Sequence, residues 1–128
     1  MKKVILEYNH VDLIITRIAH QLIENHGSFE NTAIIALQPR GIHFGKVIVR
    51  KIQTLFNIDI DYGELDTTFY RDDFRRTDKH LIPNEVNISF NIQDKNIILI
   101  DDVLYTGRTI RAALDALTDY GRPKSVEL

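Results

Sequence analysis

Two adjacent carboxylates follow a short aliphatic run near the carboxyl end of the chain. Asp101 and Asp102 come directly after Ile97–Ile100, which is too short for a helix and has the composition of a strand buried on both faces. Open α/β sheets bind their ligands at the carboxyl ends of such strands. We therefore expect the two carboxylates to face a ligand. The alternative interpretations are a solvated acidic turn and a strand-end acid pair like that of a receiver domain.

A small hydroxyl-bearing loop, Thr106-Gly107-Arg108-Thr109, comes next and precedes a helical pattern. Backbone N–H groups and the helix dipole attract phosphate at a helix start. Gly107 lets the backbone approach an anion, and the threonine hydroxyls add donors. A plain helix cap explains any one of these residues but not the set. Carboxylates beside a phosphate-binding loop suit a ligand with vicinal hydroxyls and a phosphate, such as a phosphorylated ribose.

The run Asp101–Ala113 matches the signature of the type I phosphoribosyltransferases, which bind 5-phosphoribosyl-1-pyrophosphate (PRPP). It resembles most the PyrR-like members, which are pyrimidine-operon attenuators and also uracil phosphoribosyltransferases. Further segments resemble the same family in the same order, so the similarity covers nearly the whole chain. These segments are Thr16–His20, Arg40–Ile42, Tyr70–Asp73 and Asp119–Pro123.

The resemblance implies a reaction in which a base nitrogen displaces pyrophosphate from the anomeric carbon of PRPP. It assigns Asp101 and Asp102 to the ribose hydroxyls and to the water shell of a Mg²⁺ ion that binds with PRPP. The hydroxyl-bearing loop Thr106–Thr109 is assigned to the 5-phosphate. For Arg108, a solvent-facing side chain is the alternative interpretation. Such a reaction needs an oriented ribose, a neutralised leaving group and exclusion of water.

A second candidate site is the turn Gln38-Pro39-Arg40-Gly41, which follows the predicted buried strand Thr32–Leu37. The family has its pyrophosphate loop at this place. Arg40 offers a rigid fork for phosphate oxygens, and Gly41 opens the backbone for close approach. We expect the Gln38–Pro39 bond to be cis, since an X–Pro bond lowers the cost of that isomer.

Leu65–His80 corresponds to the flexible hairpin that folds over PRPP in the family. Tyr70 and Arg71 are the candidates for contacts with pyrophosphate. The basic residues that follow them are equally well explained as a solvated charge run. Tyr105 stands where purine-specific relatives commonly have an acid, and this favours a pyrimidine base.

Apolar periodicity predicts the elements that position these residues. We expect a helix over about 10–25, with Asn9 as its N-cap and Gly27 as its stop. Strands are expected at 32–37, 58–69, 86–92, 97–100 and 125–128, with helices from 42 to 56 and from 110 to about 120. Strand–helix alternation implies an α/β fold, a mostly parallel sheet flanked by helices, with the hairpin as a lid.

Composition limits the classes of function. The 128 residues are 44% hydrophobic and 27% charged, which is ordinary for one globular domain. A net charge of −2 argues against broad attraction to nucleic acid or anionic membranes. The chain has no cysteine and no apolar run of membrane length, so we expect a cytoplasmic protein. The five histidines lack metal-site spacing and are expected to be structural or exposed.

Three functions remain open. The first is a PRPP-dependent uracil phosphoribosyltransferase, for which the resemblance implies a homo-oligomer. The second is an RNA-binding attenuator, with Thr16–His20 as a family-suggested contact for RNA or a second subunit and an exposed helix face as the alternative. The third is a PRPP-binding remnant without catalysis. It is considered because we expect residues 1–128 to form a single domain that lacks the family's last strands and base-binding region.

Overall fold

Helices and strands alternate along the chain in the computed structural model, which describes residues 3–67, 88–103 and 107–128. Their order is α1 (Tyr8–His26), β1 (Thr32–Gln38), α2 (Gly41–Phe56), β2 (Asp61–Asp66), β3 (Asn96–Ile100), α4 (Arg108–Leu117) and β4 (Ser125–Glu127). This alternation confirms the predicted α/β class.

The four strands form one parallel sheet in the order β2-β1-β3-β4. β1 is central, and its residue Ala36 lies opposite Glu64 of β2 and Ile100 of β3. Because all the strands run in the same direction, the carboxyl ends of β1, β2 and β3 share one edge of the sheet. Ligands bind at this edge in open α/β folds.

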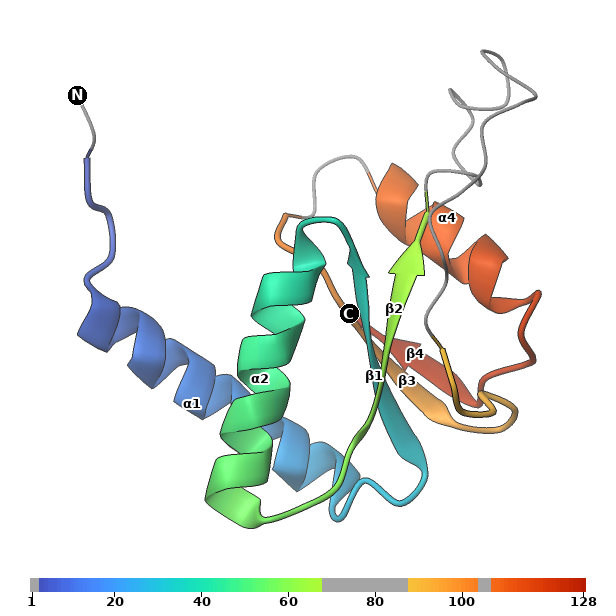
Figure 1. The fold of residues 1–128 in the computed structure, drawn as a ribbon, viewed down its shortest axis with the longest axis horizontal. Coiled ribbons are helices and arrows are strands. Elements are labelled where there is room, and N and C mark those ends of the chain that lie inside the picture. Colours follow the sequence, from blue (N-terminus) through green and yellow to red (C-terminus); the bar gives the residue numbers. More distant parts are fainter. Residues whose placement is uncertain (1–2, 68–87, 104–106) are drawn as a thin grey trace.

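Helices cover both faces of the sheet, with α1 and α2 on one side and α4 on the other (Figure 1). Alternate residues of the central strands divide between the two faces: Ile34 and Ile98 pack under α1 and α2, whereas Ile35 and Leu99 pack against α4. All four side chains are buried. Burial of each such side chain contributes about 1.5–3 kcal/mol, so the aliphatic runs of the sequence fix these strands.

The structure corrects the predicted start of the first helix. α1 begins at Tyr8 and its N-cap is Glu7, whose carbonyl accepts the Val11 amide at 3.0 Å. Asn9, predicted as the cap, lies inside the first turn. Exposed polar side chains tolerate a helical backbone there, so the apolar periodicity alone underestimates the length of the helix. The predicted stop is confirmed, since Gly27 is the C-cap with φ 59°.

Two predicted strands differ from the structure. β2 covers only Asp61–Asp66, because β1 begins at Thr32 and offers no residue for Ile58 to pair with. Over 88–92 the described backbone forms no strand, and Ile88, Phe90 and Ile92 pack against the core on the α4 side. Their alternation reflects packing rather than strand pairing.

The predicted lid lies mostly outside the described residues, which omit 68–87. Within the described ranges, none of the helices is both long and apolar enough to cross a bilayer.

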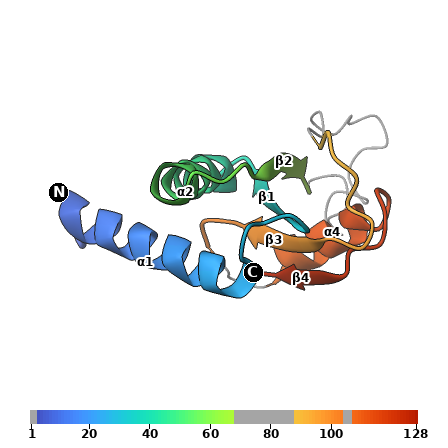
Figure 2. The same cartoon turned by 90° about the horizontal axis from the view of Figure 1, so that it is seen from below.

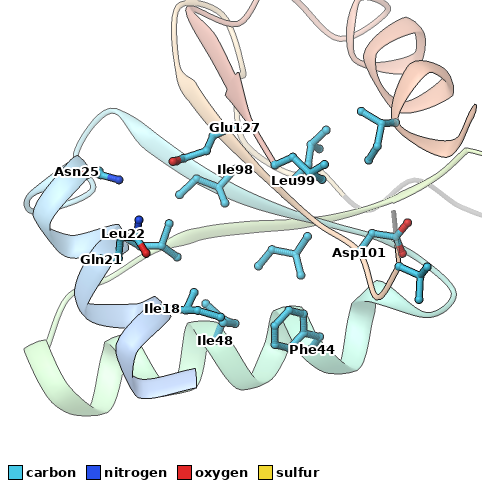
Figure 3. A pocket seen from close by; sticks show the side chains of 14 residues that line it. Ile18, Gln21, Leu22, Asn25, Phe44, Ile48, Ile98, Leu99, Asp101 and Glu127 are labelled. Carbon is cyan, nitrogen blue, oxygen red and sulfur yellow. The ribbon is translucent and has the colours of Figure 1, made fainter. Parts of the chain in front are cut away.

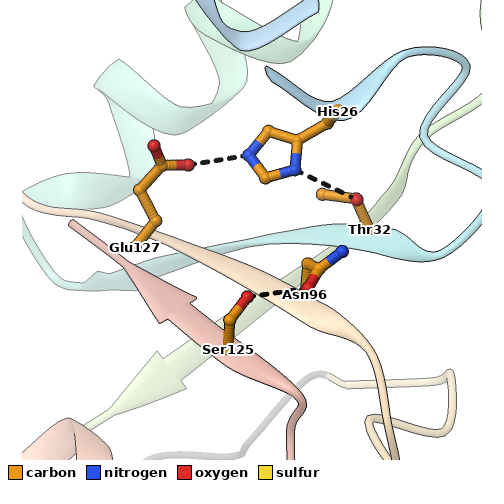
Figure 4. Close-up of polar contacts among 5 residues, drawn as sticks. All are labelled: His26, Thr32, Asn96, Ser125 and Glu127. Carbon is orange, nitrogen blue, oxygen red and sulfur yellow. Dashed lines mark hydrogen bonds and ion pairs between the residues drawn. The ribbon is translucent and has the colours of Figure 1, made fainter.

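A largely buried histidine connects the last strand to the first helix (Figure 4). His26 Nε2 donates to the Glu127 carboxylate at 2.7 Å, and its Nδ1 lies 3.3 Å from the hydroxyl oxygen of Thr32. The His26 side chain is 11% exposed and Thr32 is 2% exposed. Ser125 adds a second link from β4, donating to the Asn96 side chain at 2.7 Å. The expectation of a structural role is therefore confirmed for His26.

We predict that His26→Ala lowers the free energy of unfolding by about 1–3 kcal/mol, because it removes both hydrogen bonds and leaves the buried Thr32 hydroxyl without this partner. Urea denaturation measures the change. His10→Ala, at an exposed position of the same helix, is the control and should stay within about 0.5 kcal/mol of the wild type. Equal stability of His26→Ala and His10→Ala would contradict the structural role.

Candidate functional site

The structure brings two of the predicted site segments to one edge of the sheet. Arg40 and Gly41 follow β1, and Asp101 and Asp102 follow β3. β1 and β3 are adjacent and parallel, so both segments emerge on the same side. The Gln38–Pro39 bond between β1 and Arg40 is cis, as predicted. The sheet therefore joins a basic turn and an acid pair that are separated by about sixty residues in sequence.

Asp101 is half-buried, whereas Asp102 and Arg40 are exposed. Burial is the main cause that raises the pKa of Asp101 above its ordinary value, and the neighbouring Asp102 carboxylate adds to the rise. The Asp102 amide, which donates to Asp101 Oδ1 at 2.8 Å, opposes this rise in pKa, as does the guanidinium of Arg40. Arg40 and Asp101 thus interact electrostatically across the two strand ends.

The start of α4 has the backbone expected of an anion-binding turn. Gly107 is its N-cap with φ 81°, a conformation that favours glycine, and its carbonyl accepts the Arg111 amide at 2.9 Å. The amides of Thr109 and Ile110 belong to the first turn, where N–H groups have no acceptor within the helix. Apart from its two chain neighbours, no atom of the described residues lies within 4 Å of the position that a methyl group on Gly107 would take.

Several predicted site residues lie outside the described ranges. They are Tyr70 and Arg71 of the predicted lid, Tyr105, and Thr106 at the start of the hydroxyl-bearing loop. Their assignments stay predictions. Arg108 and Thr109, the other side-chain donors of that loop, are described, with Arg108 exposed and Thr109 half-buried.

An apolar cavity of about 340 Å³ adjoins the acid pair. Figure 3 shows Asp101 at one end of this cavity and Asn25 at the other, with Phe44, Ile18 and Leu99 between them. It lies beside the part of β3 that extends past the last residue paired with β4, because that pairing runs only from Asn96 to Ile98. Its lining is mainly apolar, and its polar members are Gln21, Asn25, Asp101 and Glu127.

The sequence did not reveal how closely the two site segments pack. Gly41 is buried, and its α-carbon faces the backbone of Ile100 and Asp101. A signal was present: Gly41 and Gly45 are four residues apart and so share one face of α2. That spacing indicates that α2 packs closely against another element. It does not indicate that this element is β3.

The donor set suits a magnesium ion that is shared with a phosphorylated ligand. In the part of the chain that the structure describes, no group of three or more histidine or acidic side chains is placed to hold a metal ion. Mg²⁺ needs only one or two carboxylates when waters and substrate phosphates supply the remaining ligands. Asp101 and Asp102 can provide them.

Comparisons with known proteins show the family of this chain. The model of the phosphoribosyl transferase domain family matches residues 4–128. The bifunctional protein PyrR of Acetivibrio thermocellus is 47% identical over 127 residues, which are 99% of this chain and 69% of that protein. The bifunctional protein PyrR of Haemophilus ducreyi is 44% identical, over 100% of this chain and 72% of that protein.

Solved structures share the fold at low sequence identity. A hypoxanthine phosphoribosyltransferase from Staphylococcus aureus superposes with a TM-score of 0.72 and 16% identity, over 98% of this chain and 64% of that one. An HGPRT-ase from Leishmania tarentolae superposes with a TM-score of 0.70 and 8% identity, over 97% of this chain and 66% of that one. The chain thus spans roughly two thirds of the length of these relatives. With a family model over 4–128 and relatives above 40% identity along the whole chain, this protein belongs to the phosphoribosyltransferase family and, within it, to the PyrR group.

Proposed function

We propose that this chain is a cytoplasmic phosphoribosyltransferase that transfers the 5-phosphoribosyl group of PRPP to uracil, forming UMP and releasing pyrophosphate. The observation that supports this proposal most is the meeting of Arg40 with Asp101 and Asp102 at the carboxyl edge of a parallel sheet. That edge offers a cation for the leaving group and carboxylates for the sugar. PyrR relatives along the whole chain support the same reaction.

In the proposed mechanism the base nitrogen attacks the anomeric carbon as the bond to pyrophosphate breaks, through a transition state that resembles an oxocarbenium ion. Asp101 and Asp102 accept hydrogen bonds from the ribose hydroxyls and fix the sugar. Arg40 neutralises charge that develops on the departing pyrophosphate. The amides and hydroxyls of Thr106–Thr109 hold the 5-phosphate. Orientation and charge stabilisation thus supply the catalysis.

Asp101 and Asp102 would hold Mg²⁺ through its water shell. When bound, the ion supplies charge neutralisation at the pyrophosphate oxygens. We assign Tyr70 and Arg71 to the cover over bound PRPP and Gly41 to the pyrophosphate loop. Tyr105 lacks the carboxylate of purine-specific relatives, and this supports a pyrimidine as the accepting base.

A regulatory function is the second candidate, because the PyrR relatives are bifunctional by name. The exposed face of α1 includes Arg17 and His20, within the segment that the family suggests for RNA or subunit contacts. The net charge of −2 restricts RNA contact to such a local patch. In this alternative the same PRPP site would sense pyrimidine nucleotides.

We predict that the wild type forms UMP from uracil, PRPP and Mg²⁺, and that Asp101→Asn combined with Asp102→Asn abolishes both turnover and PRPP binding while the circular dichroism spectrum is retained. The carboxylates lie at a strand end and not in the core, so their loss spares the fold. Calorimetry with PRPP and a UMP assay measure both effects. Unchanged PRPP affinity in the double variant would rule out the assignment.

The same assay separates the alternatives. Absence of turnover with every base, together with tight, salt-sensitive binding to a pyrimidine-operon leader RNA, would support the attenuator instead of the enzyme. PRPP binding with neither turnover nor RNA binding would support the remnant.

We also propose that the protein self-associates. Val4, Ile5 and Leu13 are 70%, 87% and 65% exposed, and the first half of α1 projects away from the sheet (Figures 1 and 2). Exposed apolar side chains gathered in one segment are typical of interaction surfaces. We expect the wild type to sediment as an oligomer and Leu13→Glu to shift it toward the monomer. A monomeric wild type at micromolar concentration would contradict this.

The raised pKa of Asp101 predicts a pH-dependent stability. Between the ordinary carboxyl pKa and the raised value, the native state binds more protons than the unfolded chain, so stability falls as pH rises through this window. Ionised Asp101 is therefore destabilising at neutral pH. We expect Asp101→Asn to raise the free energy of unfolding at about pH 7 and to lose this advantage at about pH 3, where the wild-type carboxyl is protonated.

Urea denaturation at both pH values measures the difference, with the exposed Asp115→Asn as a matched control. A stability gain of Asp101→Asn that is equally large at both pH values, or a gain shared by Asp115→Asn, would contradict the burial of the Asp101 charge.

A further inference from the structure

The first residue of α2 packs against the backbone of β3 without any side chain between them. A methyl group on Gly41 would lie 2.4 Å from the carbonyl oxygen of Ile100 and 3.1 Å from the Cα of Asp101. Real Cβ atoms do not approach other atoms to within 3.0 Å, so only glycine fits unless the two backbones move apart. The atoms in the way are backbone atoms, which cannot rotate aside as a side chain can.

This contact joins the two halves of the candidate site. Arg40 immediately precedes Gly41, and Asp101 immediately follows the carbonyl that Gly41 touches. A displacement of the Ile100–Asp101 peptide would carry the Asp101 carboxylate with it. A displacement of the start of α2 would likewise carry Arg40. The separation of the backbone segments that carry Arg40 and Asp101 is therefore set at Gly41.

A second glycine one turn later provides a comparison. A methyl group on Gly45 would lie 2.7 Å from the Cβ of Ala36 and 3.4 Å from the ring of Tyr62. These atoms belong to β1 and β2 and not to β3. Gly45 thus sets how closely the body of α2 lies on the sheet, whereas Gly41 sets where its first turn meets the acid pair.

We propose that Gly41 is a positioning residue that fixes the distance between the pyrophosphate-binding Arg40 and the ribose-binding Asp101 and Asp102. At this distance PRPP binds to both subsites at once. The inference rests on the function proposed above and deepens it. A ligand that spans two prearranged subsites binds far more tightly than either of its parts, and loses this advantage when the spacing changes. The methyl group added by Gly41→Ala points at the backbone of Ile100 and leaves the backbone amide of residue 41 in the pyrophosphate loop. The change should therefore weaken binding of the spanning ligand more than binding of the separate parts.

The test compares three ligands on Gly41→Ala by calorimetry with Mg²⁺: PRPP, ribose 5-phosphate and pyrophosphate. Ribose 5-phosphate and pyrophosphate each occupy one subsite only. We expect the affinity for PRPP to fall by about 30-fold or more, while the affinities for the two parts change by no more than about threefold. An unchanged affinity for PRPP, or an equal loss for all three ligands, would overturn the proposal.

Gly45→Ala is the matched control, because it adds the same methyl group to the same helix face. It should cost stability without a selective loss of PRPP affinity. Ala36→Gly in the same chain removes the atom in the way and should restore part of that stability, since glycine inside a strand is itself destabilising. A selective PRPP loss in Gly45→Ala as large as that in Gly41→Ala would show that general disturbance of α2 is enough, and would overturn the specific role of Gly41.

If Gly41→Ala does not fold, Ile42→Gly replaces it, because this change loosens the first turn of α2 without adding an atom beside Ile100. The expected result is again a selective loss of PRPP affinity, by about fivefold or more relative to the two parts. Equal changes for all three ligands would overturn the proposal. A wild-type chain that binds none of the three ligands would instead refute the proposed function itself.

Discussion

The parallel pairing of β1 with β3 is the constraint on which the rest of the structure depends. It aligns Ala36 with Ile100, so that the segments after both strands emerge together. One segment brings Arg40 and the other brings Asp101 and Asp102. Apolar packing on both faces holds this pairing, since the central strands bury side chains against α1 and α2 on one side and α4 on the other. Core and site are therefore consequences of one strand alignment.

Much of the fold could be predicted from local sequence, because strands buried on both faces are nearly uniform aliphatic runs. Thr32–Leu37 and Ile97–Ile100 are of this kind, and both are strands in the structure. Predictions were wrong where a partner far along the chain decides the outcome. Ile58 is a residue type common in strands, but β1 has no residue opposite it. Ile92 belongs to an alternating apolar pattern that arises from packing into the core and not from strand pairing.

For the candidate site, too, local features could be predicted from the sequence and long-range features could not. Residue types and spacing predicted Asp101, Asp102 and Gly107 as candidate site residues, because such motifs are local. Their environment was not predictable from the sequence. The pKa of Asp101 is raised by burial and by Asp102 and is opposed by Arg40, which follows β1 about sixty residues earlier. The proposed role of Gly41 depends on its contact with a carbonyl of β3. A half-buried acid beside a second acid costs stability, a cost that functional sites commonly bear.

A crystal of the protein soaked with PRPP and Mg²⁺ would show whether the two strand ends bind one ligand. We expect one PRPP molecule across the edge of the sheet, with its pyrophosphate at Arg40, its ribose hydroxyls at Asp101 and Asp102, and its 5-phosphate at the start of α4. Electron density for PRPP elsewhere on the protein, or carboxylates turned away from the sugar, would refute this arrangement.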